Sequence, residues 1–168
     1  MCPGNRYTAA LTVAIILASF PLPGAAAEPG SDDHHSEQAA HESHPRNLVA
    51  VFAGTTFEER RDRDPALGIE YERRLSSDFG VGVLAERTFD EAKTWVFAVP
   101  FALHRGAWKF YLAPGIEDSD RGASERLLRI GGEYAFEVGG REIAPQIDID
   151  LVDGEQVYVL GVTFGIGF

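Results

Sequence analysis

Large apolar residues alternate with small ones along the last eleven residues of the chain. Counting back from the end, every second residue is apolar or aromatic: Phe168, Ile166, Phe164, Val162, Leu160 and Tyr158. The residues between them are small or slim: Gly167, Gly165, Thr163, Gly161 and Val159. A period of two predicts a β-strand with one large apolar face and one small face. This combination favours a strand in a closed membrane barrel, with lipid outside and a narrow lumen inside.

The same alternation begins at Arg46 and predicts eight strands. Their expected ranges are 47–57, 66–75, 79–88, 94–104, 107–117, 126–138, 141–151 and 157–168. Each is close to the roughly ten residues that a tilted membrane strand requires, and polar or glycine-rich turns separate them. The predicted fold class is therefore all-β, an eight-stranded antiparallel up-and-down transmembrane β-barrel over residues 46–168.

The two faces of the predicted strands differ sharply in charge. In the strand at 94–104, one face consists of Trp95, Phe97, Val99, Phe101 and Leu103. A soluble sandwich would bury such faces against each other, whereas a membrane barrel turns them outward to lipid and encloses the charges. Aromatic residues near the strand ends, polar faces rich in Gly and Ala, and the final Phe168 favour the barrel.

The charged residues on the opposite faces are the candidate site. They are Glu70, Glu72, Arg74, Glu86, Lys109, Arg129, Glu133, Asp148 and Asp150. In an interior wide enough only for side chains, such charges must pair and hydrogen-bond. We expect Arg129 and Lys109 to compensate neighbouring carboxylates and plug the lumen. Carboxylates outnumber bases, so a narrow cation-preferring channel for ions or small solutes is the alternative.

The first 45 residues differ in composition from the rest. Arg6, the apolar run 11–20 and Ala25 to Ala27 predict a cleaved signal peptide over 1–27. Residues 28–45 contain no large apolar residue and predict a disordered acidic linker. Four histidines lie in this linker, and a flexible histidine-bearing tract is a candidate for weak binding of a divalent metal: His34, His35, His41 and His44.

Charge and residue content narrow the function classes. The formal net charge of −11 argues against a nucleic-acid partner. The single cysteine, Cys2, would leave with the signal, so no thiol chemistry is expected. His104 is the only histidine in the predicted barrel, no serine lies two residues from it, and it is expected as an interfacial turn residue. We therefore expect no enzymatic activity and no cofactor.

The signal peptide, the eight alternating segments and the terminal apolar pattern ending at Phe168 resemble the small Gram-negative outer-membrane β-barrels of the OmpA-like and OmpX-like size class. The resemblance implies an outer-membrane location with the linker in the periplasm, contact with the lipid bilayer and lipopolysaccharide, and a structural role in the envelope. It also implies that Phe164, Ile166 and Phe168 form a signal for the outer-membrane assembly machinery.

Two further expectations follow from the strand count and from the period. An even number of strands places both termini on one side, expected to be periplasmic, with tight turns at 76–78, 104–106 and 139–140.

A soluble periplasmic ligand-binding β-barrel would share the same period of two, and it differs from a membrane barrel in burying the apolar faces.

Overall fold

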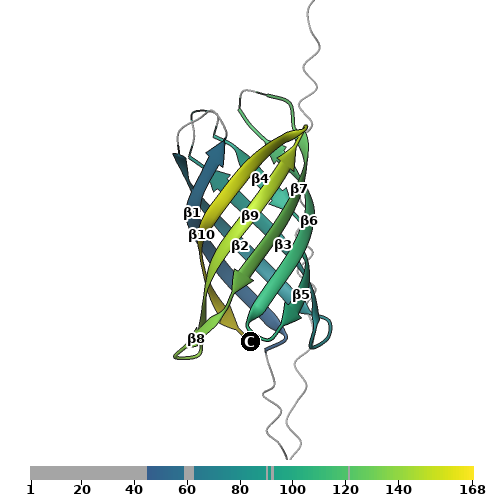
Figure 1. Ribbon diagram of the computed structural model, residues 1–168, viewed down its shortest axis with the longest axis vertical. Coiled ribbons are helices and arrows are strands. Elements are labelled where there is room, and N and C mark those ends of the chain that lie inside the picture. The colour runs from purple at the N-terminus through teal and green to yellow at the C-terminus, as the bar shows by residue number, and fades with distance from the viewer. Residues whose placement is uncertain (1–44, 59–62, 90, 92, 121) are drawn as a thin grey trace, which may run out of the picture. The chain divides into compact units, whose positions relative to one another are not determined.

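The computed structural model describes residues 45–58, 63–89, 91, 93–120 and 122–168, and their regular structure is β (Figure 1). The strands are β1 (Asn47–Glu58), β2 (Arg63–Arg74), β3 (Phe79–Thr88), β4 (Trp95–Ala98), β5 (Phe101–Arg105), β6 (Trp108–Asp118), β7 (Glu125–Tyr134), β8 (Phe136–Val138), β9 (Arg141–Val152) and β10 (Glu155–Gly167). Neighbouring strands pair antiparallel, and β10 pairs with both β9 and β1, so the sheet closes into a barrel. No helix in these ranges is long and apolar enough to cross a membrane.

The ten strand segments make eight barrel strands, because two of the strands are interrupted. β4 and β5 keep a single register against β3, with Ala98 opposite Leu84 and Phe101 opposite Val81. Pro100 lies between them and has no N–H to donate to the ladder. The register of β7 and β8 against β9 likewise places Pro145 opposite Tyr134, directly before the break at Ala135. The prediction of eight strands in an up-and-down antiparallel barrel is confirmed, although the strands expected at 94–104 and 126–138 are not continuous.

The barrel has two different ends. We call the end that holds residues 75–78, 106–107 and 139–140 the turn end, and the opposite end the loop end. Gly139 and Gly140 have φ of +60° and +74°, which suits the tight connection of β8 to β9. Asn47 and Phe168 meet at the turn end, where the Asn47 N–H donates to the Phe168 carbonyl oxygen at 3.0 Å. The loop between β1 and β2 is shorter than expected, because pairing extends to Phe57 and Arg63.

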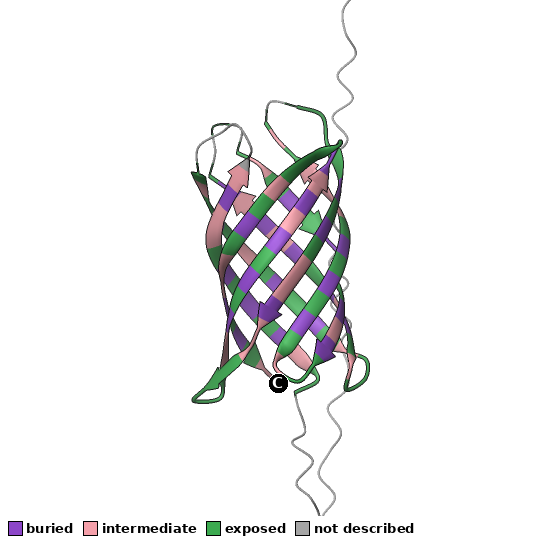
Figure 2. Ribbon diagram, viewed as in Figure 1, coloured by how far each residue is buried: buried purple, intermediate pink, exposed green. Residues whose placement is uncertain are grey.

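Apolar residues cover the outside of the barrel and charged residues lie inside. Figure 2 shows buried and exposed positions alternating along the strands. Phe97, Phe110 and Ile147 are 36%, 47% and 56% exposed, whereas the charges at neighbouring inward positions are buried. A soluble barrel that buries its apolar faces would show the opposite arrangement. The predicted inversion of polarity is therefore confirmed.

Aromatic residues gather near both ends of the outer surface. At the turn end, the ring centroids of Trp108 and Tyr134 are 4.9 Å apart, and those of Tyr134 and Phe136 are also 4.9 Å apart. At the loop end, Trp95 stacks on Phe97 with centroids 5.9 Å apart. Two aromatic belts flanking an apolar band are typical of a barrel that spans a bilayer.

The glycines of β10 make room for side chains of β1 at the closing seam. Phe52 is 2% exposed and lies in the lumen, where it forms an apolar cluster with Ala66 and Val159. A Cβ added at Gly161 would collide with the Phe52 ring and would lie 2.6 Å from the Ala53 carbonyl oxygen. At Gly165 it would lie 2.8 Å from Leu48 Cδ1. The small face of the last strand is therefore the complement of the bulky inward face of the first.

We expect Gly161→Ala to destabilise the barrel by about 1–3 kcal/mol, because the added methyl group overpacks the seam against Phe52. Urea unfolding of the refolded protein, followed by tryptophan fluorescence, measures the change. Gly132→Ala is the matched control, since a Cβ there would meet Phe110 Cδ1 at an ordinary 3.4 Å. Equal effects of the two substitutions would contradict the proposed seam packing.

Candidate functional site: the charged lumen

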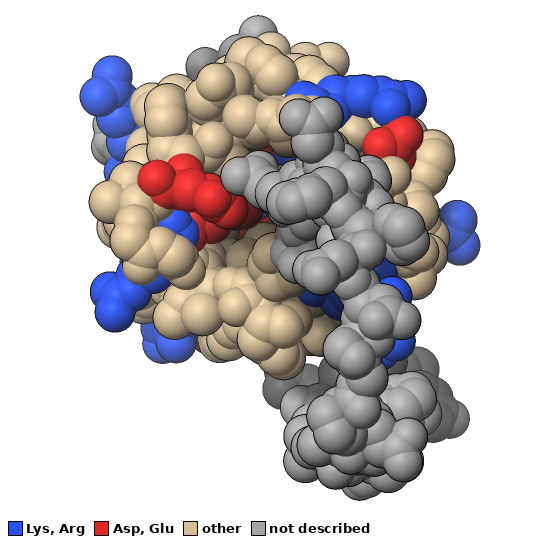
Figure 3. Space-filling model, turned by 90° about the horizontal axis from the view of Figure 1, so that it is seen from below, with Lys and Arg blue, Asp and Glu red and all other residues tan. Residues whose placement is uncertain are grey.

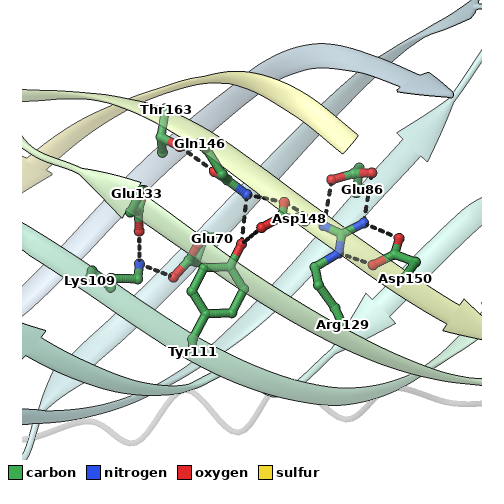
Figure 4. A network of polar contacts seen from close by, with 10 residues as sticks. All are labelled: Glu70, Glu86, Lys109, Tyr111, Arg129, Glu133, Gln146, Asp148, Asp150 and Thr163. Atoms are coloured by element: carbon green, nitrogen blue, oxygen red, sulfur yellow. Dashed lines mark hydrogen bonds and ion pairs between the residues drawn. The ribbon is translucent and has the colours of Figure 1, made fainter. Parts of the chain in front are cut away.

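The structure places all nine predicted lumen residues at inward positions of β2, β3, β6, β7 and β9. Arg74 is half-buried near the turn end, and the other eight are buried. Figure 4 shows polar contacts among most of them, which join side chains from several strands. The network has two cationic centres, Arg129 and Lys109.

Arg129 on β7 holds two carboxylates in bidentate contacts. Its Nε and Nη2 donate to the two oxygens of Asp150 at 2.7 and 2.8 Å. Its Nη1 and Nη2 donate to the two oxygens of Glu86 at 2.8 and 3.1 Å. The Arg129 side chain is 0% exposed, so these charge-assisted bonds replace its hydration. Asp148 lies further away, with Oδ2 at 3.9 Å from Nη1.

Lys109 on β6 contacts three carboxylates. Its Nζ lies 2.8 Å from Glu70 Oε1, 3.0 Å from Glu72 Oε2 and 2.5 Å from Glu133 Oε1. The contact with Glu70 is a hydrogen bond, and the contacts with Glu72 and Glu133 are ion pairs. Glu72 Oε1 in turn lies 2.6 Å from His104 Nε2, and His104 Nδ1 lies 3.3 Å from Arg74 Nη2. The second cluster therefore reaches the turn end.

Neutral polar side chains fill the space between the two cationic centres. The Tyr111 hydroxyl donates to Asp148 Oδ1, and Gln146 Nε2 donates to Asp148 Oδ2 at 2.6 Å and to the Tyr111 hydroxyl at 2.8 Å. Thr163 Oγ1 donates to Gln146 Oε1 at 2.6 Å. Gly131 faces this group, and a Cβ there would collide with both Asp148 and Tyr111. The glycine is thus needed for the tyrosine to reach the aspartate.

The ion pairs cross the lumen. Lys109 and Glu70 come from β6 and β2, and Arg129 and Glu86 from β7 and β3. In each pair, two barrel strands separate the partners even by the shorter way around the closed sheet. Side chains that start on such distant strands and still meet at 2.8 Å leave little free width between them. Ion pairs therefore span the lumen at these two levels.

An apolar layer adjoins the Arg129 cluster on the side of the loop end. Leu127 and Val152 lie two residues from Arg129 and Asp150 along their strands, and both are buried. They belong to one cluster of buried residues with Val96 and Ala113. From the turn end to the loop end, the lumen thus contains the Lys109 cluster, the Tyr111 hydrogen bonds, the Arg129 cluster and apolar side chains.

One residue of the lumen lies elsewhere than the sequence predicted, and three others were not among the predicted site residues. His104 was expected as an interfacial turn residue, which is wrong: it is 6% exposed and lies in the lumen. β5 extends to Arg105, and the alternation turns His104 inward together with Ala102. Tyr111, Gln146 and Thr163 also occupy inward positions, and strand parity was the signal that could have added them.

The remaining candidate residues lie elsewhere. Phe164, Ile166 and Phe168 are on the outer surface, at least half exposed. His34, His35, His41 and His44 fall outside the described residues. Within the ranges that the structure covers, no group of three or more His, Cys, Asp or Glu residues is arranged to hold a metal ion.

A closed eight-stranded antiparallel barrel with an apolar exterior and a charged interior is the fold of the small outer-membrane β-barrels. No family model and no curated protein matches the sequence. The chain is similar in structure to Neisserial surface protein A, with 8% identity, a TM-score of 0.51, and coverage of 73% of this chain and 96% of that one. It is likewise similar to the N-terminal β-barrel domain of Pseudomonas aeruginosa OprF, with 14% identity, a TM-score of 0.51 and coverage of 74% and 99%. A structure from the de novo design of transmembrane β-barrels matches with 11% identity, a TM-score of 0.50 and coverage of 73% and 97%. At these identities, the similarity shows the fold.

We expect Arg129→Met to destabilise the barrel by about 3–5 kcal/mol, because it leaves the buried carboxylates of Glu86 and Asp150 without a cation. Adding Glu86→Gln and Asp150→Asn to the same protein should recover much of that loss. Urea unfolding of the three proteins measures both effects. A single substitution with no cost, or a triple variant no more stable than the single one, would contradict the pairing.

Tyr111→Phe should cost about 1–3 kcal/mol, since Asp148 and Gln146 both lose a buried hydrogen-bond partner. Tyr158→Phe is the control, because the Tyr158 hydroxyl is exposed and its bond to Gln156 Oε1 is long, at 3.4 Å. Equilibrium unfolding of both variants gives the comparison. If the control loses as much stability as Tyr111→Phe, the buried hydrogen bonds do not stabilise the lumen.

Proposed function

We propose that the protein is a structural component of the outer membrane of a Gram-negative bacterium, with a lumen closed by its own side chains. The observation that carries the proposal is the pair of ion contacts across the barrel, Lys109 to Glu70 and Arg129 to Glu86. The apolar exterior between two aromatic belts supports membrane placement, because lipid is the solvent that such a surface requires. The proposal includes no reaction and no cofactor.

The orientation follows from the usual arrangement of such barrels, in which the short turns face the periplasm. The turn end, with Asn47 and Phe168, is then periplasmic. Residues 1–27 act as a signal peptide and 28–45 as a periplasmic linker whose histidines bind divalent metal weakly. Phe164, Ile166 and Phe168 are read by the outer-membrane assembly machinery, and the loop end meets lipopolysaccharide. The outward placement of Phe164, Ile166 and Phe168 supports their role as an assembly signal, since such a signal must be exposed during insertion.

The second candidate is a narrow channel that prefers cations. The observation that favours it is an excess of buried carboxylates among the described residues. The carboxylates are Glu70, Glu72, Glu86, Glu133, Asp148 and Asp150, and the buried bases are Lys109, Arg129 and the imidazole of His104. A pore lined by carboxylates favours cations. For ions to pass, the crossing pairs and the apolar layer at Leu127 and Val152 would have to separate.

Fractionation and planar-bilayer conductance test the proposal together. The protein should be retained in the outer-membrane fraction, and the refolded wild-type protein should pass no measurable current. Arg129→Ala and Lys109→Ala should lower stability and increase current, whereas Arg126→Ala on the exposed surface should change neither. Steady cation-selective current through the wild-type protein would favour the channel. Release with the soluble periplasm, or lumen variants unchanged in both current and stability, would contradict the proposal.

A further inference from the structure

Three of the outward rows of side chains end in arginine at the turn end of the barrel. On β2 the outward row runs from Ile69 through Tyr71 to Arg73, and on β5 from Phe101 to Arg105. On β9 the outward row begins with Arg141 and continues to Ile143. All three arginines are exposed. We call Arg73, Arg105 and Arg141 the arginine rim.

The two ends of the barrel differ in the sign of their charge. Among the described residues, the turn end carries five arginines (Arg46, Arg73, Arg74, Arg105, Arg141) against three carboxylates (Asp78, Glu137, Glu142). At the described part of the loop end, carboxylates outnumber bases: the carboxylates include Asp64, Glu91, Glu117, Asp118, Asp120, Glu125, Asp153 and Glu155, and the bases are Arg63, Arg87, Lys93 and Arg126. The turn end therefore has the stronger attraction for anions.

The three arginines of the rim occupy outward strand positions, so they lie around the barrel rather than over the lumen. Viewed from the turn end, Figure 3 shows basic side chains spaced around the outer edge, while an acidic group reaches toward the middle. Arg105 also lies opposite Trp108 in the pairing of β5 with β6, so the rim is level with an aromatic belt. Aromatic belts sit at the depth of the lipid headgroups.

We infer that the arginine rim binds the phosphate groups of anionic phospholipids in the leaflet that surrounds the turn end. The inference rests on the proposed membrane placement and adds a lipid preference to it. A guanidinium group matches a phosphate in bidentate geometry, and basic residues beside a membrane attract anionic lipids. Arg105 also contacts Asp78 at 2.7 Å, but both side chains are exposed, and a pair of this kind is weak.

The chain contains a fluorescent reporter at each end. Its two tryptophans are Trp108 at the turn end, 49% exposed, and Trp95 at the loop end, 39% exposed. Trp95→Phe and Trp108→Phe thus leave one reporter each. Both proteins are reconstituted in phosphatidylcholine nanodiscs that contain a minor share of brominated phosphatidylglycerol or, for comparison, the same share of brominated phosphatidylcholine. Bromine quenches a tryptophan only at contact. The ratio of quenching by brominated phosphatidylglycerol to quenching by brominated phosphatidylcholine therefore reports the lipid composition around each tryptophan.

At Trp108, we expect brominated phosphatidylglycerol to be enriched about fivefold over brominated phosphatidylcholine at low salt. The ratio should fall toward one in Arg73→Gln/Arg105→Gln/Arg141→Gln, and also at about 1 M salt, where the Debye length is short. At Trp95 the ratio should stay near one. Arg63→Gln/Arg126→Gln, at the loop end, is the matched control and should leave the ratio at Trp108 unchanged.

Equal quenching by the two lipids at Trp108 of the otherwise unmodified protein would overturn the inference. An enrichment that persists without the three arginines would overturn it as well. Heat-modifiable gel mobility reports folding and insertion separately from lipid preference. A protein that inserts without preference refutes the lipid site alone, whereas a protein that does not insert refutes the membrane placement too.

Discussion

Closing eight strands into a barrel leaves an interior that side chains must fill from opposite walls, and the rest of the structure depends on this constraint. Charges that enter such a space lose their water and need partners within it. The guanidinium of Arg129 takes two carboxylates in bidentate contacts, and the ammonium of Lys109 takes three. Because some partners come from strands far apart in the sheet, each cationic centre both neutralises charge and holds two walls of the barrel together.

The same narrowness explains the glycines. Phe52 and Tyr111 are the large rings inside the barrel, and each lies where neighbouring strands present glycine, at Gly161 and Gly131 respectively. Where one strand has a large inward residue, the neighbouring strand has glycine, which leaves space for it. The seam between β1 and β10 therefore closes by shape as well as by backbone hydrogen bonds, and the Asn47 side chain reinforces it by donating from Nδ2 to the Phe168 carbonyl oxygen at 3.2 Å.

Much of this architecture was predictable, because residues two apart along a strand lie on the same face, so the sequence shows which face is charged. The eight strands, the closed antiparallel order and the inward position of Arg129 and Lys109 follow from that parity. The particular partners do not, since the choice of Glu86 for Arg129 depends on the stagger between strands that are not neighbours. His104 was misplaced because strand ends are uncertain in sequence, and the interruptions at Pro100 and Ala135 depend on prolines in the ladder.

Lipid exposure of the apolar face is the central claim, and site-directed spin labelling tests it most directly. Single cysteines replacing Phe97, Phe110 and Ile147 place nitroxides on the outer surface, and Ala113→Cys places one inside. In reconstituted bilayers, the three outer labels should collide readily with oxygen, which concentrates in acyl chains, and rarely with a water-soluble nickel complex. The inner label should be reached by neither. Outer labels shielded from both reagents, or open to the nickel complex, would contradict the account.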